Sequence, residues 1–358
     1  MPDAISHELH PMIDDEMSEK VGLPPGTVVH TGPERTEEVT INIMEFLDGQ
    51  MREYVADSID DCSPPADPRA TKWVHVNGVH DVEIVKRVCG YYDVHPLVVE
   101  DIPSVGQRPK IDTMDTGTYI VLRSFSIKSG HESISSEQVS IVFGRGFILT
   151  FQESAADLFA PIREQARVQR SVLRSKKSDY LTYRVMDLII DRYFVVLERI
   201  GDLIENLEDD LIARGSAEML NRIYRLKRSL QALRRFVWPL REVSLKLQRE
   251  GSKYVNEETY IYFRDLYDHI IRVTDHVETY RESITGMLDI YLSSISNQMN
   301  EVMQFLTIVS TIFIPLTLVT SLYGMNWPWV PGLDLPILVT SFLMSFVLLI
   351  VFKLRRWV

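Results

Sequence analysis

The sequence has few cysteines, fewer positive than negative charges, and no opening segment typical of secretion. The two cysteines, Cys62 and Cys89, are too few and too far apart for a disulfide framework or a zinc knuckle, as expected in a reducing cytosol. The 38 Lys and Arg residues against 50 Asp and Glu residues give a net charge of −12, which argues against a nucleic-acid partner, because phosphates need clustered positive charge. No basic stretch followed by an apolar run stands at the N-terminus, so we expect no signal peptide and a large domain inside the cell. Cations are better partners for this chain.

Charge is also missing from two long stretches near the C-terminal end, whereas the first 300 residues are densely charged. The stretches Phe305–Tyr323 and Leu335–Phe352 contain 19 and 18 uncharged residues, close to the roughly 20 that cross a bilayer core as a helix. Aromatic residues, which membrane interfaces attract, stand at their edges: Trp327, Trp329, Phe352 and Trp357. Lys353 and Arg355 follow the second stretch, so the positive-inside rule puts the C-terminus in the cytoplasm and, with two spans, the N-terminal body as well. The sequence predicts a multi-pass protein of the cell (inner) membrane, in contact with the lipid bilayer, with both termini cytoplasmic.

Residues 36–165 mix strand and helix signals and predict a cytosolic α/β domain. Strands are expected at Val39–Leu47, Lys72–Val76, Thr118–Ile127, Gln138–Phe143 and Phe147–Phe151. The segment Asp81–Tyr91 has the pattern of a capped helix, and Gly144–Gly146 is typical of a hairpin turn. Residues 1–35 carry several prolines without apolar periodicity, and we interpret them as a flexible N-terminal tail.

Apolar residues recur at helical spacing from Leu158 almost to the end of the chain. Within residues 166–250 they predict a helical hairpin, with one helix at Tyr180–Ala213, a turn at Gly215 and a second helix at Ala217–Glu250. The second half of the first helix is mainly acidic and the second helix is mainly basic, so the two should attract each other.

A third helical stretch, Asn256–Tyr323, has no break before Pro315 and would be roughly 100 Å long. Two sets of residues repeat every seven positions in it: Phe263, Ile270, Val277, Ile284 and Tyr291, and Leu266, Val273, Tyr280 and Met287. Such a repeat is typical of a coiled-coil seam, so we expect the helix to pack laterally against copies of itself. This part of the chain then divides into a stalk at 251–303, a first membrane helix at 304–323, an external loop at 324–334, a second membrane helix at 335–353 and a basic tail at 354–358.

One face of the first membrane helix is mostly small and polar. Its heptad positions are Asn300, Thr307, Ile314 and Ser321, with Met303, Ser310, Thr317 and Gly324. Run backwards, the same series reach acidic residues of the stalk, including Asp289, so the stripe predicts a water-filled cation pathway. Two simpler interpretations stay open, namely that the acidic part is the solvated side of a coiled coil and that membrane hydroxyls bond carbonyl oxygens of their own helix. We expect the latter for Thr311 and Thr320, which lie off the stripe.

The tetrapeptide Tyr323-Gly324-Met325-Asn326 closes the first membrane stretch, close to the basic C-terminal end. In this setting the sequence resembles the CorA family of magnesium and cobalt channels, from about Val39 to Val358. Further stretches carry the resemblance: Val94–Leu97, Glu100–Ile102, Gln107–Lys110, Trp238–Glu242, Tyr262–Asp265 and Asn300–Met303. The resemblance implies a funnel-shaped homopentamer with an α/β cytosolic domain, a long-helix stalk and two C-terminal transmembrane helices. In it, Gly324, Met325 and Asn326 form the ion selectivity loop, and the Asn326 amides offer neutral oxygens to hydrated Mg²⁺.

The resemblance also implies which residues gate and regulate the pore. Met303 and Ile314 correspond to a hydrophobic gate. Asp101 and Asp265 correspond to a regulatory metal site across a subunit interface, so that internal Mg²⁺ holds the pore shut. Weaker candidates for a second ion there are Glu100, Asp187 and His269. Mg²⁺ is thus both transported and regulatory, with Co²⁺ as a further substrate. The sequence departs from the family pattern in two places, because the loop after the motif lacks Glu and because Ile314 stands where relatives often have Met.

Two other functions fit parts of the sequence. A zinc transporter of the same two-span superfamily would share the tripeptide, although the nine histidines show no clustered zinc-ligand spacing. A membrane-tethered cytosolic enzyme would also combine a charged body with an apolar tail, but the sequence has no Gly-rich phosphate loop, nucleophile elbow or paired metal-binding histidine motif. We therefore expect no enzymatic activity. The sequence does not separate Mg²⁺, Co²⁺ and Zn²⁺ as the physiological ion.

Overall fold

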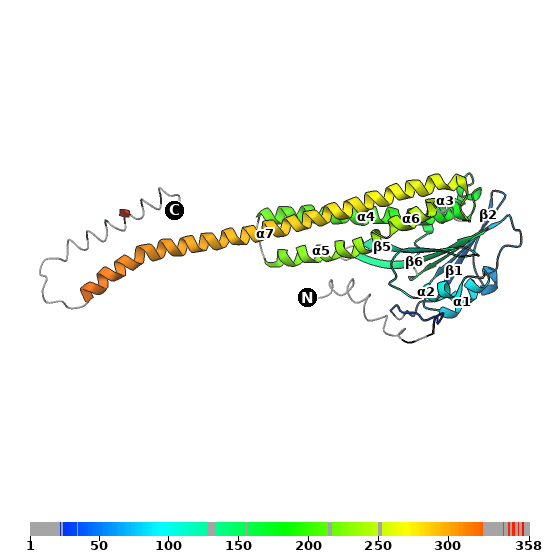
Figure 1. Ribbon diagram of the computed structural model, residues 1–358, viewed down its shortest axis with the longest axis horizontal. Helices are drawn as coiled ribbons and strands as arrows, with labels where there is room; N and C mark the ends of the chain where they lie inside the picture. Colours follow the sequence, from blue (N-terminus) through cyan, green and yellow to red (C-terminus); the bar gives the residue numbers. More distant parts are fainter. Residues whose placement is uncertain are drawn as a thin grey trace. The chain divides into compact units, whose positions relative to one another are not determined.

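The computed structural model describes residues 24–33, 35–127, 134–154, 156–213, 217–249 and 253–324, together with isolated positions elsewhere. The chain forms two compact units, the first made of Met1–Asp209 and Asn221–Thr285 and the second of Asp210–Leu220 and Gly286–Val358. The first unit contains the whole sheet, most of the helical hairpin and the start of the long helix (Figure 1).

The described strands form a seven-stranded sheet in the order β2-β1-β3-β7-β6-β5-β4. The strands are β1 (Thr40–Leu47), β2 (Gln50–Val55), β3 (Thr71–Asn77), β4 (Lys110–Thr113), β5 (Thr118–Ile127), β6 (Ile134–Gly144) and β7 (Phe147–Gln152). All neighbours are antiparallel except β3 and β7, which pair in parallel at the centre of the sheet. Gly146, with a φ of 77°, supplies the left-handed conformation that the tight turn between β6 and β7 needs.

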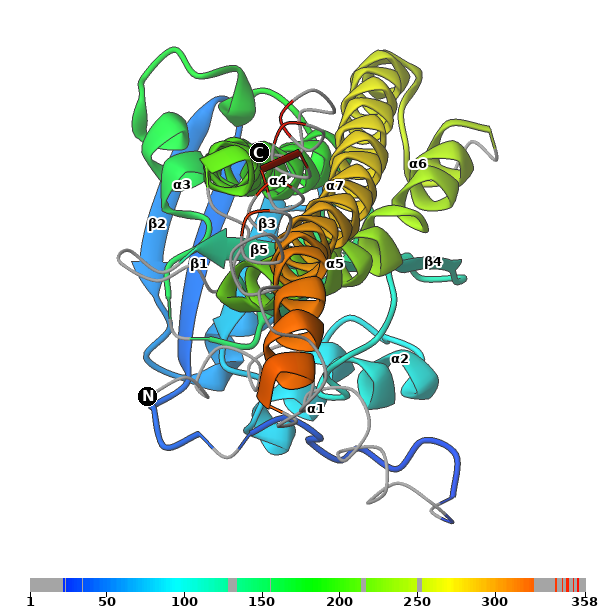
Figure 2. The same cartoon turned by 90° about the vertical axis from the view of Figure 1, so that its left-hand side faces the viewer.

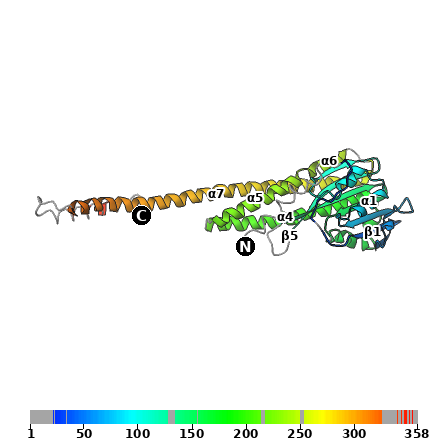
Figure 3. The ribbon, with the colours of Figure 1, turned by 90° about the horizontal axis from the view of Figure 1, so that it is seen from below.

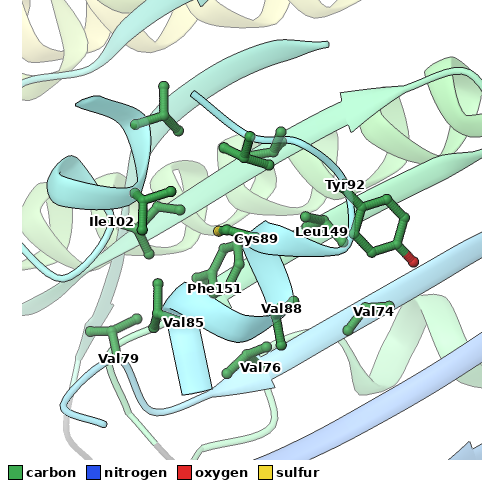
Figure 4. Close-up of a cluster of buried hydrophobic side chains, with 14 of the residues drawn as sticks. Val74, Val76, Val79, Val85, Val88, Cys89, Tyr92, Ile102, Leu149 and Phe151 are labelled. Carbon is green, nitrogen blue, oxygen red and sulfur yellow. The ribbon is translucent and has the colours of Figure 1, made fainter. Parts of the chain in front are cut away.

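One face of the sheet is covered by α1 (Val82–Gly90) and α2 (Pro96–Asp101), as Figure 2 shows. Asp81 caps α1 by accepting hydrogen bonds from the backbone of Glu83 and Ile84, which confirms the predicted start of this helix. Val88 and Cys89 of α1 pack with Leu149 and Phe151 of β7 in the buried core of this face (Figure 4). The alternation of side chains along each strand explains why one strand serves both faces.

The opposite face is covered by α3 (Ala160–Arg167) and the first part of α4 (Ser178–Ala213). The ring of Phe159, the residue before α3, lies 5.9 Å from that of Trp73 and 4.9 Å from that of His75. The hydroxyl of Ser178 donates a hydrogen bond of 2.6 Å to the carbonyl oxygen of Gly144. These contacts fix α4 against the sheet, and they explain why sheet and hairpin form one unit.

The remaining helices are α5 (Ala217–Val237), α6 (Leu240–Arg249) and α7 (Glu257–Gly324), and two 3₁₀ turns lie at Ile59–Cys62 and Val172–Arg174. The expectation of one unbroken helix from Ala217 to Glu250 is wrong, because the chain breaks between α5 and α6. Pro239 at this break has no backbone N–H to donate, and its ring disfavours the helical conformation of Trp238 before it.

The apolar seam of α7 is buried within the single chain. Its members Phe263, Ile270, Val277 and Ile284 are each at most 1 % exposed. The ring of Phe263 contacts that of Tyr183 on α4, and its carbonyl oxygen accepts a hydrogen bond from Ser244 on α6. Figures 1 and 3 show α4, α5 and this part of α7 side by side. The expectation that this seam packs against copies of the chain is therefore wrong, because α4 and α6 of the same chain supply the cover.

The second unit contains the far part of α7. Its buried apolar side chains are Leu211, Met219, Met287 and Tyr291. Beyond Tyr291, α7 carries large apolar side chains that are exposed in the single chain: Leu292, Met299, Val302, Met303, Phe305, Leu306, Phe313, Ile314 and Leu318. A surface of this kind needs lipid or other protein chains to cover it.

Residues 24–33, which belong to the predicted flexible tail, dock on the loop after α2. The backbone N–H of Thr31 donates to the carbonyl oxygen of Pro103 at 3.3 Å, and its hydroxyl accepts from the N–H of Val105 at 3.0 Å. These ten residues of the expected flexible tail are thus held by hydrogen bonds to a neighbouring loop. Such contacts leave no apolar periodicity in the sequence.

Candidate metal centre

Asp101 is the last residue of α2, and its carboxylate is held on both oxygens. The side-chain amide of Gln107 donates to Oδ1 at 2.8 Å and also to the backbone carbonyl oxygen of Asp101 at 3.0 Å. The ammonium group of Lys110, at the start of β4, lies 2.5 Å from Oδ2. Asp101 is therefore a positioned, partly exposed carboxylate that already has a cationic partner.

The loop that carries Gln107 is anchored from β6. The side chain of Gln138 accepts a hydrogen bond of 3.0 Å from the backbone N–H of Gln107 and donates to the carbonyl oxygen of Ser104 at 3.2 Å. The N–H of Gln138 in turn donates to the carboxyl group of Glu153. Burial raises the pKa of Glu153 to about 7, and the charge of Arg123 only partly offsets this effect. A chain of hydrogen-bonded polar groups thus runs from the buried Glu153 and Gln138 to the half-buried Gln107 and Asp101.

Glu100, next to Asp101 on α2, accepts a hydrogen bond of 2.7 Å from the backbone N–H of Gly26. The docked segment 24–33 therefore contacts α2 at the residue next to Asp101. A cation at Glu100 would lie beside this segment.

A second group of possible ligands joins α4 and α7. His269 Nε2 lies 3.7 Å from an oxygen of Asp265, and His269 Nδ1 lies 3.5 Å from Oδ1 of Asp187. Asp191, one turn after Asp187, completes a set with Asp187 and His269 whose ligand atoms all lie within 4.8 Å of one another. Arg184 pairs with the other carboxylate oxygen of Asp187.

Two atoms of this group have no hydrogen-bond partner among the described residues, although both are buried: Oδ1 of Asp187 and Nδ1 of His269. Their separation of 3.5 Å allows an ion pair but their geometry makes no hydrogen bond. Burial, and after it the charge of Asp191, raises the pKa of Asp187 above its usual range. Two carboxylates and an imidazole with unused electron pairs can bind a divalent cation, which would supply the missing charge.

The structure brings together some of the predicted site residues and not others. Asp187, Asp265 and His269 lie close together, and Glu100 and Asp101 are neighbours on α2. Within the described part of one chain, the carboxylates of Asp101 and Asp265 share no bonded partner, so their proposed pairing depends on a second subunit.

Sequence reasoning missed three residues of these sites. Asp191 carried a usable signal, because it lies four residues after Asp187 and so on the same face of a helix. Gln107 and Lys110 belong to the stretch Gln107–Lys110 that carries the family resemblance. No pattern in the sequence indicates that their side chains contact Asp101.

The stripe assigned to the pore lies along one continuous helix. Its members Asp289, Asn300, Met303, Thr307, Ser310, Ile314, Thr317 and Ser321 are all exposed or half-buried in the single chain. The hydroxyls of Thr307 and Thr317 donate to the carbonyl oxygens of Met303 and Phe313, just as Thr311, off the stripe, does to Thr307. Hydroxyl bonding alone therefore does not distinguish the stripe from the rest of the helix.

The residues expected to form a selectivity loop lie at the edge of the described region. Gly324 is the last residue of α7, whereas Met325 and Asn326 lie outside the described residues. The same holds for the external loop and the basic tail, and for most of the second membrane stretch.

Comparison with known sequences gives a consistent result. The profile of the family described as CorA-like Mg²⁺ transporter protein matches residues 69–356. The cobalt/magnesium transport protein CorA of Thermotoga maritima is 40% identical over 351 residues, covering 97% of this chain and 100% of its own. The putative metal ion transporter YfjQ of Bacillus subtilis is 32% identical over 261 residues, or 73% of this chain and 80% of its own.

Solved structures share the fold. The complete structure of the CorA magnesium transporter from Methanocaldococcus jannaschii matches with a TM-score of 0.73 at 21% identity, covering 91% of this chain and 100% of its own. The ZntB cytoplasmic domain from Vibrio parahaemolyticus matches with a TM-score of 0.60 at 14% identity, covering 73% of this chain and 100% of its own. The family profile and the Thermotoga relative confirm the resemblance drawn from the Gly-Met-Asn motif, and the chain belongs to the family of CorA-like Mg²⁺ transporter proteins.

Proposed function

We propose that this chain is a subunit of a channel that conducts Mg²⁺ and Co²⁺ across the cell membrane and that closes when Mg²⁺ binds to its cytosolic part. One observation carries the proposal, namely that a single helix, α7, runs from the ligand group at Asp265 and His269 to a long exposed apolar segment. A cation bound to the first part can thus act mechanically on the second. The names of the relatives, a cobalt/magnesium transport protein among them, support these ions as substrates.

The membrane part of the proposal rests on composition and exposure. Within the part of the chain that the structure describes, α7 is the helix long and apolar enough to cross a membrane, with none of its most apolar window buried. Residues 304–323 would form the first span and residues 335–353 the second, with both termini in the cytoplasm. Lipid would cover the apolar side chains of α7 that face away from the stripe.

In the proposed assembly, five copies of α7 surround a pore lined by the polar stripe. Met303 and Ile314 would form apolar rings that exclude water when the pore is narrow. Gly324, Met325 and Asn326 would form the outer ion-binding ring. Because Mg²⁺ loses its water reluctantly, neutral amide and carbonyl oxygens at a wide radius suit it better than a tight carboxylate cage.

Regulation would follow from the carboxylates of the first unit. Asp101 of one subunit and Asp265 of the next repel each other unless a cation lies between them, so Mg²⁺ would stabilise the arrangement that brings them close. Asp187, Asp191 and His269 fit a second ion, because Asp187 and His269 each present a buried atom without a hydrogen-bond partner among the described residues.

A second candidate is zinc transport. The imidazole of His269, which lies beside the carboxylates of Asp187 and Asp191, favours zinc as the ion. Nitrogen ligands suit Zn²⁺ and Co²⁺ better than Mg²⁺. In this reading, the oxygen-only pair Asp101 and Asp265 would still bind Mg²⁺.

The decisive experiment is ion uptake into liposomes that contain the purified full-length protein, with Mg²⁺, Co²⁺ and Zn²⁺ in competition. We expect Mg²⁺ and Co²⁺ to enter and each to reduce uptake of the other. Asn326→Ala should abolish uptake while the oligomer stays intact by size-exclusion chromatography. Uptake of Zn²⁺ alone would favour the second candidate, and wild-type uptake by Asn326→Ala would contradict the selectivity loop.

A further inference from the structure

Lys110 lies within reach of two carboxylates and one aromatic ring. Its ammonium group is 2.5 Å from Oδ2 of Asp101 and 3.7 Å from Oδ2 of Asp112, and it lies 5.6 Å from the centre of the Tyr119 ring. The side chains of Lys110 and Asp101 are 35% and 27% exposed, so the pair is shielded in part but remains reachable from solvent. Lys110 can therefore leave Asp101 without losing every favourable contact.

Hydrogen bonds hold the carboxylate of Asp101 in place, so that it has little freedom to move with Lys110. Gln107 binds its side chain and its backbone carbonyl oxygen at once, and Gln138 fixes the backbone of Gln107 from β6. The carboxylate is thus presented at a fixed place, while the cation beside it is carried by a flexible four-carbon stem. A rigid anion with a movable counter-cation is an arrangement that permits exchange of one cation for another.

We propose that Lys110 is a built-in competitor of the regulatory divalent cation at Asp101. This inference rests on the proposed function, because it assumes that Asp101 binds Mg²⁺. A divalent cation on Asp101 would repel an ammonium group 2.5 Å from the same carboxylate oxygen, so binding requires that Lys110 move to Asp112. Lys110 then sets the Mg²⁺ concentration at which the cytosolic part responds, and it fills the site when Mg²⁺ is scarce.

The test measures the Mg²⁺ concentration that gives half-maximal protection of the full-length protein from proteolysis. A glutamyl endopeptidase suits the measurement, because it cleaves after glutamate and so at none of the residues that these variants remove or introduce. Lys110→Met keeps most of the length of the side chain and removes its charge, so the midpoint should fall about three- to fivefold, the range expected for a partly exposed ion pair. Lys110→Arg keeps the charge and should leave the midpoint equal or raise it. Asp112→Asn removes the carboxylate to which Lys110 would move when Mg²⁺ binds, and it should raise the midpoint by about twofold.

The matched control is Lys86→Met, which removes the same charge from an exposed pair with Glu83 on α1. Its midpoint should equal that of the wild type. A midpoint of Lys110→Met that is unchanged or raised, or an equal fall in Lys86→Met, would overturn the competitor role. Absence of Mg²⁺ protection in the wild type, or its persistence in Asp101→Asn, would instead contradict the regulation on which the inference rests.

Discussion

The two parts of α7 differ in what covers their apolar side chains. Ile270, in the first part, is 1% exposed, whereas Ile314, the same residue type in the far part, is 67% exposed. The first part lies against α4 and α6 of its own chain, and the part of α7 beyond Tyr291 has no such cover in the described residues. A heptad repeat thus predicts an apolar face that other atoms must cover. It does not indicate whether the same chain, another chain or lipid covers that face.

The largest expected effect is a contrast in stability between these two isoleucines. Ile270→Ala should lower the free energy of unfolding of the first unit by about 2 to 5 kcal/mol, because it leaves a cavity in a packed core. Ile314→Ala, the same chemical change, should lower it by less than about 0.5 kcal/mol, because no core surrounds that side chain in the chain. Urea unfolding of the detergent-solubilised protein, followed by tryptophan fluorescence, measures both. Equal losses would contradict the difference in burial between Ile270 and Ile314.

Much of the fold could be predicted, because its strongest patterns are local. The strand β5 matches its predicted range, β7 ends one residue later than predicted, and β6 begins at Ile134 instead of Gln138 and ends one residue later. No pattern in the sequence predicts β2 or β4. The residues of β2 are mostly exposed or half-buried and include Arg52 and Glu53, so no apolar alternation marks it, and β4 has only four residues. Such edge strands form because a neighbour pairs with them, which a local pattern does not record.

Contacts between distant segments account for the errors. The heptad repeat of α7 favours packing of its seam against copies of the chain. In the structure, Tyr183 and Ser244 of the same chain contact Phe263 in this seam. At the candidate site, the family resemblance pointed to Asp187 and His269 together. The hold of Lys110 on Asp101 depends on how β4 lies beside α2, and no spacing in the sequence encodes that contact.

The stability of the first unit should depend on pH. The stretch Val302–Leu333 in the far part of α7 carries no charged residue and should not contribute to this dependence. Burial raises the pKa of Glu153 from 4.5 to about 7, so the folded first unit keeps a proton that the unfolded chain releases. This contribution to stability is fully present below about pH 4.5 and is lost as the pH rises through about 7. Glu153→Gln should therefore reduce the fall in unfolding free energy between pH 5 and pH 8 by on the order of 2 kcal/mol.

The exposed carboxylate of Glu83 gives the control for this prediction. Glu83→Gln should leave the pH profile of thermal unfolding as it is in the wild type. A Glu153→Gln profile that keeps the full wild-type slope would show that another group titrates in this range.

Neutralising the proposed regulatory carboxylates should abolish the response to Mg²⁺ without abolishing ion transport. The double variant Asp101→Asn with Asp265→Asn should lose Mg²⁺-dependent protection from proteolysis, with a midpoint raised at least about tenfold, while ion conduction persists. Asp57→Asn with Glu258→Gln changes the charge equally on exposed side chains and should behave as the wild type. Conduction lost with protection retained would mean that these carboxylates belong to the ion path.

The smallest expected effect concerns the gate in the far part. Ile314→Asn and Met303→Gly should each raise Mg²⁺ leak several-fold at concentrations that silence the wild type, because a polar or smaller ring admits water. Phe305→Ala, off the stripe, is the control and should close normally. Tight closure by both gate variants in a liposome flux assay would place the constriction elsewhere.

The most direct test of the central claim is the water accessibility of single cysteines along the far part of α7. The native Cys62 and Cys89 are buried and unpaired, and burial raises the pKa of the Cys62 thiol to about 11 and that of Cys89 further still, so both should stay inert. In membranes at low Mg²⁺, a charged thiol reagent should modify Thr307→Cys and Ser310→Cys on the stripe. It should leave Phe305→Cys and Ile312→Cys, which would face lipid, unmodified. Equal modification of all four positions would contradict a pore on one face of α7 and lipid on the other. It would mean that water surrounds this part of the helix on every side.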